Sequence, residues 1–295
     1  MPQDYLFFHV ISPAMKHVFY ILSLTLISVA AKAQYYYKDI ELTRQMHQKY
    51  QSLKNAGIRT VNLRSLEADG SPTEGFAGIQ LIEEDYRHMT TRMSTPVTGK
   101  SILENYFDGR GRLIKTIDST EGSKSISEYK YDTKGNLLSI VNKTSSVGKV
   151  LESEVHNWQM DDQGRYVKMT RIRNGSDSSV YNMVLDENGN IIEEKGRKGS
   201  NELPTVFYYY DESNRLTDVV RYSKKAARLL PDYVMDYDEK GKIKSLMIVP
   251  EGSDDYQRWI YQYNDKGLRT KEIAFNKRKQ QLGSIEYNYS TRPGS

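Results

Sequence analysis

The sequence Tyr-Lys-Tyr-Asp-Thr-Lys-Gly at residues 129–135 is the clearest copy of a unit that recurs along the chain. In each copy an Asp or Asn is followed three positions later by Gly or Asn. These anchoring residues stand 24 to 29 positions apart, at 108, 132, 161, 186, 211, 238 and 264. Self-similarity at a near-constant spacing is the signature of a repeat architecture. The sequence after residue 98 is therefore predicted to form one repeating structure.

Each copy of the unit has the features of a β-hairpin. Tyr129 and Tyr131 are two residues apart, so they share one face of a strand. Asp132 suits the start of a turn because its carboxylate accepts hydrogen bonds from the backbone that follows. Gly135 supplies the left-handed conformation that such a turn requires, and a second apolar segment begins at Leu137. Seven hairpins in series predict an antiparallel meander.

The N-terminal part of the chain is predicted to extend this meander. Asp39 is placed to cap a helix with one apolar face, made of Leu42, Met46, Tyr50 and Leu53, and Gly57 ends it. Two strands follow, at 59–67 and 76–86. The predicted fold class is all-β, a meander of about seven hairpins forming a strongly curled sheet or barrel, aromatic face inward, with one short N-terminal helix. The predicted domains are a signal peptide (1–33), a helix with two strands (34–97) and the hairpin repeats (98–295).

The Tyr-Asp-x-x-Gly-x-Leu unit resembles the YD repeat of the RHS family and the hairpins of short secreted bacterial β-proteins. The resemblance covers residues 100–290 and implies an architecture rather than an activity. Large RHS proteins form shells around a toxin and carry an Asp- and Pro-rich motif near a self-cleavage site. This chain has no Asp-Pro sequence and only seven units, so the resemblance does not imply the role of a toxin shell.

Residues 16–33 have the three parts of a secretory signal peptide. Lys16 precedes a 13-residue apolar run from Val18 to Ala30, and an Ala-x-Ala cleavage site ends at Ala33. The run is shorter than the about 20 apolar residues of a transmembrane helix. Translation is predicted to start at Met15. The exported chain, without a transmembrane segment, is predicted to reach the periplasm, the cell surface or the outside of a diderm bacterium.

The composition excludes several classes of function. The chain has no cysteine, which excludes disulfides, thiolate metal sites and cysteine nucleophiles. A net charge of +4 over 295 residues is too small to indicate nucleic-acid binding. The histidines lack metal-ligand spacing, and the repeated Asp residues are better explained by turns than by calcium loops. We therefore expect a protein that is not an enzyme and needs no cofactor.

A membrane barrel is the alternative that the alternating strands raise. Counting back from Met160 and Trp158 in steps of two, the same face meets His156, Glu154 and Glu152. Too few apolar positions remain on that face to cover a lipid-facing band about 25 Å tall. The sequence does not favour a barrel that spans a membrane.

Two sets of side chains are candidates for a function. Inward aromatic residues are suited to a glycan or lipid held inside the curl: Tyr131, Trp158, Tyr210, Tyr237, Trp259 and Tyr263. The connections opposite the turns form a basic rim: Lys195, Arg197, Lys198, Lys224, Lys225, Arg228, Lys277, Arg278 and Lys279. Such a rim suits an anionic partner, which would be an envelope glycan, lipid head groups or an acidic protein. The expected function is an exported interaction or scaffold protein of the cell envelope, and the alternative is a glycan- or lipid-binding protein.

Overall fold

The computed structural model describes residues 36–146, 148–223, 227–250 and 255–294. The predicted signal peptide lies outside these residues. Within them, one helix, α2 (Lys38–Asn55), precedes nineteen strands of a single sheet. The strands are β1 (Thr60–Glu67), β2 (Ala77–Ile82), β3 (His88–Thr95), β4 (Gly99–Phe107), β5 (Leu113–Thr120), β6 (Lys124–Tyr131), β7 (Leu137–Ser146), β8 (Lys149–Met160), β9 (Tyr166–Arg173), β10 (Asp177–Leu185), β11 (Ile191–Lys198), β12 (Asn201–Glu202), β13 (Val206–Tyr210), β14 (Leu216–Ser223), β15 (Arg228–Tyr237), β16 (Ile243–Ile248), β17 (Gln257–Tyr263), β18 (Arg269–Asn276) and β19 (Gln281–Ser290).

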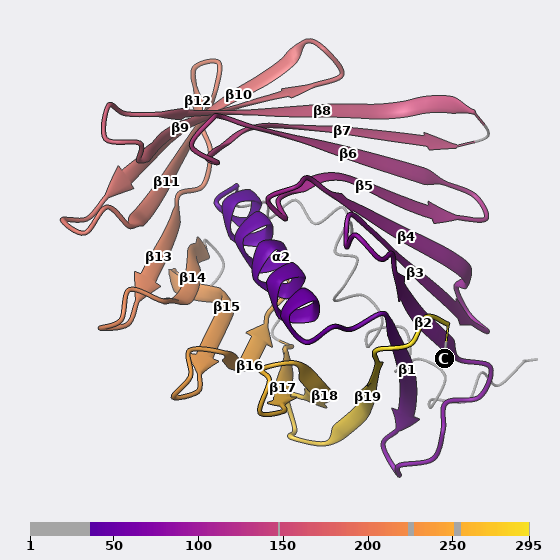
Figure 1. Cartoon of the computed structure of the whole chain (residues 1–295). Coiled ribbons are helices and arrows are strands. Elements are labelled where there is room, and N and C mark those ends of the chain that lie inside the picture. The colour runs from indigo at the N-terminus through magenta and orange to yellow at the C-terminus, as the bar shows by residue number, and fades with distance from the viewer. Residues whose placement is uncertain (1–35, 147, 224–226, 251–254, 295) are drawn as a thin grey trace, which may run out of the picture.

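The sheet closes on itself as an antiparallel barrel. Consecutive strands pair around the ring, and β19 completes it by pairing with β1 from Thr60↔Ser290 to Glu67↔Gly283. The two-residue strand β12 lies outside the ring, because β11 pairs directly with β13. In the described parts of the chain, eighteen of the nineteen strands therefore form the wall of the barrel. Figure 1 shows this wall surrounding α2.

The predicted meander of seven hairpins, as a curled sheet or barrel, is thus wrong. Its seven Asp-x-x-Gly turns account for fourteen strands, from β4 to β11 and from β13 to β18. The closing strands are β19, β1, β2 and β3, which do not carry the repeated turn. Between the helix and residue 97 the structure has three strands where the sequence indicated two. Closure removes the two exposed sheet edges that a curled meander would leave.

The seven turns lie together at one end of the barrel, which we call the turn rim. In the turn at Asp132, the backbone N–H of Asp132 donates to the carbonyl of Asn136 at 2.9 Å. One carboxylate oxygen of Asp132 accepts from the backbone N–H groups of Gly135 and Asn136, at 2.7 and 2.8 Å. Gly135 has φ +101°, and Asn214, which replaces glycine in the fifth unit, has φ +56°. The turn chemistry predicted from the sequence is confirmed.

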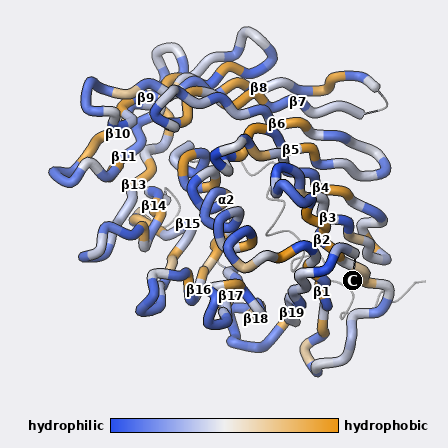
Figure 2. Tube along the Cα trace, in the orientation of Figure 1, coloured by the Kyte–Doolittle hydropathy of each residue, from blue (hydrophilic) through white to orange (hydrophobic). Residues whose placement is uncertain are grey.

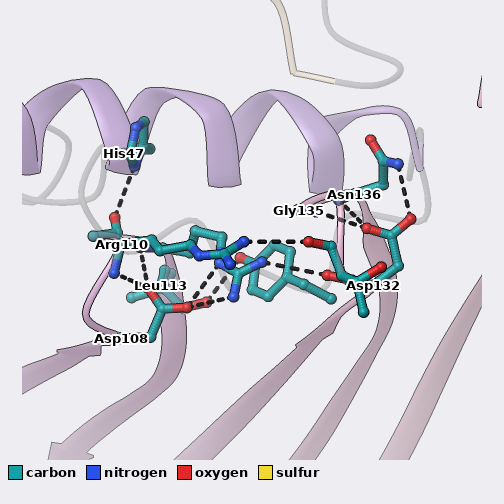
Figure 3. Close-up of polar contacts among 11 residues, drawn as sticks. His47, Asp108, Arg110, Leu113, Asp132, Gly135 and Asn136 are labelled. Carbon is teal, nitrogen blue, oxygen red and sulfur yellow. Dashed lines mark hydrogen bonds and ion pairs between the residues drawn. The ribbon is translucent and has the colours of Figure 1, made fainter.

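The helix α2 lies inside the barrel and crosses the half of the lumen next to the turn rim. Its His47 ring nitrogen lies 2.9 Å from the carbonyl oxygen of Gly111, in the turn that Asp108 begins (Figure 3). Tyr50 packs on Gly111, whose φ is +77° and where an added Cβ would lie 2.4 Å from the Tyr50 ring. This close approach requires glycine at position 111.

The helix differs from its prediction at its start and on its apolar face. Tyr37 occupies the capping position without a side-chain cap, whereas Asp39 is buried in the first turn. Tyr50 and Leu53 are buried as expected, but Leu42 is 46% exposed on the side that lines the lumen. Figure 2 shows that α2 is largely hydrophilic. The helix therefore packs against one part of the wall and leaves a hydrophilic surface toward the remaining space.

Candidate functional site

The barrel encloses a cavity of about 2490 Å³ that the helix leaves unfilled. Asn214 and Gly267 line it at the turn rim, and Leu203 and Tyr222 line it at the opposite rim. Because α2 occupies the half next to the turn rim, the larger continuous wall surface lies in the other half. This half of the lumen is the candidate site.

Hydrogen-bonded pairs of small polar side chains cover the luminal wall from β2 to β7, from Ser125 and Thr144 in this half to Asn105 near the turn rim. Each pair joins two neighbouring strands, and the donor–acceptor distances lie between 2.6 and 3.2 Å. We call these pairs the polar ladder, which consists of Gln80–Thr91, Asn105–Thr116, Ser127–Asn142 and Ser125–Thr144. All eight side chains line the cavity. The ladder presents hydroxyl and amide groups whose remaining donors and acceptors are available to a ligand.

Beyond β7 the polar wall continues with ion pairs. Glu154 and Glu152 of β8 pair with Arg171 and Arg173 of β9 at 2.7 and 2.5 Å. Further pairs in this half of the lumen join Asp177 to Lys198 and Asp232 to Arg221. Because these charges neutralise one another, the wall is hydrophilic without a strong field of one sign.

The start of α2 is anchored to the wall through Glu194 of β11. Its Oε2 accepts hydrogen bonds from the backbone N–H groups of Tyr36 and Tyr37, at 2.9 and 3.2 Å, and from the Tyr208 hydroxyl at 2.8 Å. The residue is 1% exposed. Burial raises the pKa of Glu194 to about 7, although the hydrogen bonds that it accepts act in the opposite direction.

A second anchor joins Asp39 of the helix to His156 of β8. The two ring nitrogens of His156 lie 2.6 Å from Asp39 and 2.7 Å from Glu154, and the Trp158 indole donates to Asp39 at 3.3 Å. Burial alone would lower the pKa of His156, but the charges and hydrogen bonds of Asp39 and Glu154 raise it to about 9. Burial alone would raise the pKa of Glu154, but hydrogen bonds from His156 and Arg171 and their charges lower it to about 2. The imidazolium is thus held between two carboxylates.

The tyrosine that precedes a turn joins its hairpin to the one before it. The hydroxyls of Tyr131, Tyr210, Tyr237 and Tyr263 donate to backbone carbonyls of Leu113, Ile191, Leu216 and Ile243 at 2.7–2.8 Å. Arginine side chains stack on two of these rings, Arg112 on Tyr131 and Arg215 on Tyr237. These four tyrosines, which belong to the predicted ligand-facing set, thus hold neighbouring hairpins together at the turn rim.

Replacing Tyr237 by phenylalanine is expected to lower the free energy of unfolding by about 1 kcal/mol, because the Leu216 carbonyl loses its donor. Tyr209→Phe is the matched control, since Tyr209 is 47% exposed and points away from the lumen. Denaturant unfolding of both variants measures the difference. Equal losses in the two variants would contradict the structural role of the hydroxyl.

The six aromatic residues predicted to face a ligand all point inward, but they fall into two groups. Tyr210, Tyr237 and Tyr263 line the cavity. Trp158 and Trp259 are 4% and 0% exposed and belong to the packed core, and Tyr131 packs against it. A ligand role for these residues stays a prediction, and the first group is the one that a ligand in the cavity reaches.

Most described members of the predicted basic rim lie at hairpin ends opposite the turn rim. Lys195 pairs with Glu193 on the outer wall, Lys198 pairs with Asp177, and Arg197 donates to the carbonyl of Gly199. Lys224 and Lys225 lie outside the described residues. The remaining residues are exposed at two other hairpin ends: Arg228 at the start of β15, and Lys277, Arg278 and Lys279 between β18 and β19. A binding role for the basic rim stays a prediction.

The polar ladder was missed from the sequence although a signal for it is present. Ser127 and Ser125 stand two and four residues before Tyr129, so they share its inward face. The aromatic residues alone do not reveal these serines as part of the inward face. His156, Glu154 and Glu152 are on the same inward face, so the positions counted for a lipid-facing band face the lumen and not the outer wall.

The outer wall carries exposed polar and charged residues in mid-strand. Examples from β6 to β8 are Glu128, Lys130, Lys143, Asn157 and Gln159. Among the described residues, no helix is long and apolar enough to cross a membrane. Over the same ranges, no group of three or more His, Asp or Glu residues is placed to hold a metal ion.

Comparisons with known proteins give weak similarity. No family model matches the chain, and no curated protein matches it in sequence. A porin-like protein from Bacteroides uniformis is 8% identical over 79% of this chain and 96% of its own, with a TM-score of 0.39. A porin-like protein from Bacteroides vulgatus is 11% identical over 79% and 98%, with a TM-score of 0.24. A Photorhabdus luminescens Tc holotoxin pore is 15% identical over 69% of this chain and 15% of its own, with a TM-score of 0.26. These similarities are too low to carry an inference about function, and no family match supports the YD-repeat resemblance.

Proposed function

We propose that the protein is an exported, non-enzymatic binding protein that holds a hydrophilic glycan in the lumen of its barrel. The observation that carries this proposal is the cavity of about 2490 Å³ in which the helix leaves the polar wall uncovered. A purely structural scaffold needs no open interior. The unfilled lumen therefore favours the binding function over the envelope scaffold, which stays a prediction.

The chemistry of the lining supports a glycan over a lipid. The polar ladder offers hydroxyl and amide groups at regular spacing, which match the hydroxyls of a sugar chain. At the turn rim of the opposite wall, the rings of Tyr210, Tyr237 and Tyr263 add apolar surface that lines the cavity. A lipid tail would bury the remaining donors and acceptors of the ladder without partners, which is unfavourable.

Export is supported by the signal-like sequence at 16–33 and is compatible with the outer wall. Charged side chains at mid-strand are costly against lipid. Residues such as Glu128 and Lys130 therefore favour an outer wall in contact with water. The proposed site of action is the periplasm or the space outside the cell.

A binding assay with the purified protein and a panel of oligosaccharides tests the function. Isothermal titration with neutral and charged oligosaccharides, such as cello-, malto- and chitooligosaccharides, is expected to identify at least one class that binds. Thr144→Trp places a large ring in the lumen and is expected to weaken that binding by at least about ten-fold, since a buried clash forces displacement of the ligand.

The matched control is Lys143→Trp, which adds the same ring to the outer wall next to the test position. Lys143→Trp is expected to bind as the unchanged protein does. Ser125→Trp repeats the test from β6 if Thr144→Trp fails to fold. Absence of binding to every oligosaccharide, or equal binding by the luminal and outer variants, would overturn the proposed function.

A further inference from the structure

One side chain interrupts the neutral polar wall between β2 and β7. Asp118 of β5 is the only charged residue among the described residues of these six strands that line the cavity. Across the strands it is flanked by Leu103 of β4 and Ser125 of β6. The same strand places Thr116, a member of the polar ladder, on the same face. Asp118 thus lies within the surface that the proposed glycan would contact.

The carboxylate of Asp118 has no partner within the described part of the chain. Its Oδ1 is buried and accepts no hydrogen bond, and no ion pair involves this residue. Burial raises the pKa of Asp118, and no neighbouring cation acts against that rise. Asp118 is half-buried, and a carboxylate oxygen removed from water is unfavourable unless something supplies a donor or a positive charge.

Four other acidic side chains of the wall differ from Asp118. Glu152, Glu154, Asp177 and Asp232 each pair with an arginine or lysine of the adjacent strand. At these four positions the wall supplies its own cation. Among the described residues, Asp118 has no such cation on the adjacent strands, so a ligand that binds there can supply the positive charge.

We propose that Asp118 selects a glycan that carries a protonated amine, that is, an oligosaccharide of unacetylated amino sugars. The inference rests on the proposed function, because it names the ligand class of the same cavity. The ammonium group would lie against the Asp118 carboxylate, where a charge-assisted hydrogen bond is stronger than a neutral one. The neighbouring sugar hydroxyls would meet the ladder residues Ser125 and Thr116.

A matched pair of probes separates the amine from the sugar. Chitotetraose, the glucosamine tetramer, and its fully N-acetylated counterpart share the same backbone but differ in charge. Titration of the purified protein is expected to show at least about ten-fold tighter binding of the amine-bearing tetramer. Asp118→Asn is expected to reduce this preference to less than about two-fold and to leave the neutral tetramer unaffected, because the amide keeps its shape but loses its charge.

Asp218→Asn is the control variant. Asp218 lies on β14 opposite the exposed Tyr209, on the outer wall, so its replacement is expected to leave the preference unchanged. Spermidine distinguishes an amino sugar from a free polyamine. If spermidine binds as tightly as chitotetraose, the amine alone is recognised and the glycan part of the proposal is wrong.

The outcomes separate this inference from the proposed function. Equal binding of the two tetramers, or a preference that survives Asp118→Asn, overturns the role of Asp118 while the luminal glycan site stands. If neutral oligosaccharides bind and the amine-bearing tetramer does not, the role of Asp118 is likewise overturned while the luminal glycan site stands. If no oligosaccharide of any class binds, the proposed function fails and this inference fails with it. Thermal unfolding of Asp118→Asn verifies that the variant is folded.

Discussion

Replacing Glu194 by alanine is expected to lower the free energy of unfolding by about 4 kcal/mol and to release the start of α2 from the barrel wall. The carboxylate is the shared acceptor of the Tyr36 and Tyr37 backbone N–H groups and of the Tyr208 hydroxyl. Without it these donors stay buried and unsatisfied, which costs more than the hydrogen bonds themselves contribute. Denaturant unfolding at pH 7.5 measures the loss, and amide hydrogen exchange of 38–55 reports release of the helix.

Two variants at and beside this position control the prediction. Glu194→Gln keeps an acceptor oxygen, so a smaller loss of about 1–2 kcal/mol is expected. Glu193→Ala removes the neighbouring carboxylate, which pairs with Lys195 on the outer wall, and is expected to change stability by less than about 0.5 kcal/mol. Equal effects of Glu193→Ala and Glu194→Ala, or unchanged exchange in α2, would show that Glu194 does not hold the helix.

Local features of this fold were predictable because their causes are local. The turn at Asp132 follows from a carboxylate that accepts backbone hydrogen bonds and a glycine three residues later. The inward orientation of Trp158 follows from its position two residues before Met160, on the same face of the strand that leads into the turn at Asp161. In both cases the determining residues are within a few positions of one another.

Closure of the barrel was not predictable on the same basis. It depends on β1 and β19, whose paired residues Thr60 and Ser290 are 230 positions apart. Neither strand carries the Asp-x-x-Gly turn, and β3 has the mixed sequence His-Met-Thr-Thr-Arg-Met-Ser-Thr with no strong apolar pattern. The repeat shows how the wall is built but not how many strands close it.

The candidate site illustrates a similar limit. The sequence predicts Asp39 as a helix cap. In the structure the helix lies inside the barrel, and this places Asp39 against His156, 117 positions away. Asp118 is one of many aspartates in the sequence, and only the lumen distinguishes it. Pairing across strands, which a single sequence does not display, decides which charges are neutralised and which are left for a ligand.

The stability of the barrel is expected to fall as the pH rises from about 6.5 to about 9, because His156 loses its proton over this range. The folded protein binds this proton more tightly than the unfolded chain, since Asp39 and Glu154 face the imidazolium. The contribution is complete below pH 6.5 and lost as the pH passes 9. A pKa raised from 6.5 to about 9 corresponds to a contribution on the order of 3 kcal/mol.

Denaturant unfolding of the unchanged protein and of His156→Gln at pH 6, 7.5 and 9.5 tests this prediction. The two proteins are expected to differ most at pH 6 and to converge at pH 9.5. Lys49, whose pKa is lowered to about 8 by desolvation, also titrates in this range but is present in both proteins, so the difference isolates His156. His88→Gln is the control, because His88 lies on the outer side of β3 beside Glu83 and Glu104 and does not contact α2. It is expected to keep the pH dependence of the unchanged protein.

The contradicting outcome is a difference between the unchanged protein and His156→Gln that stays constant from pH 6 to 9.5. In that case His156 stabilises the helix anchor as a neutral ring, and the assignment of a charged imidazolium between Asp39 and Glu154 would be wrong.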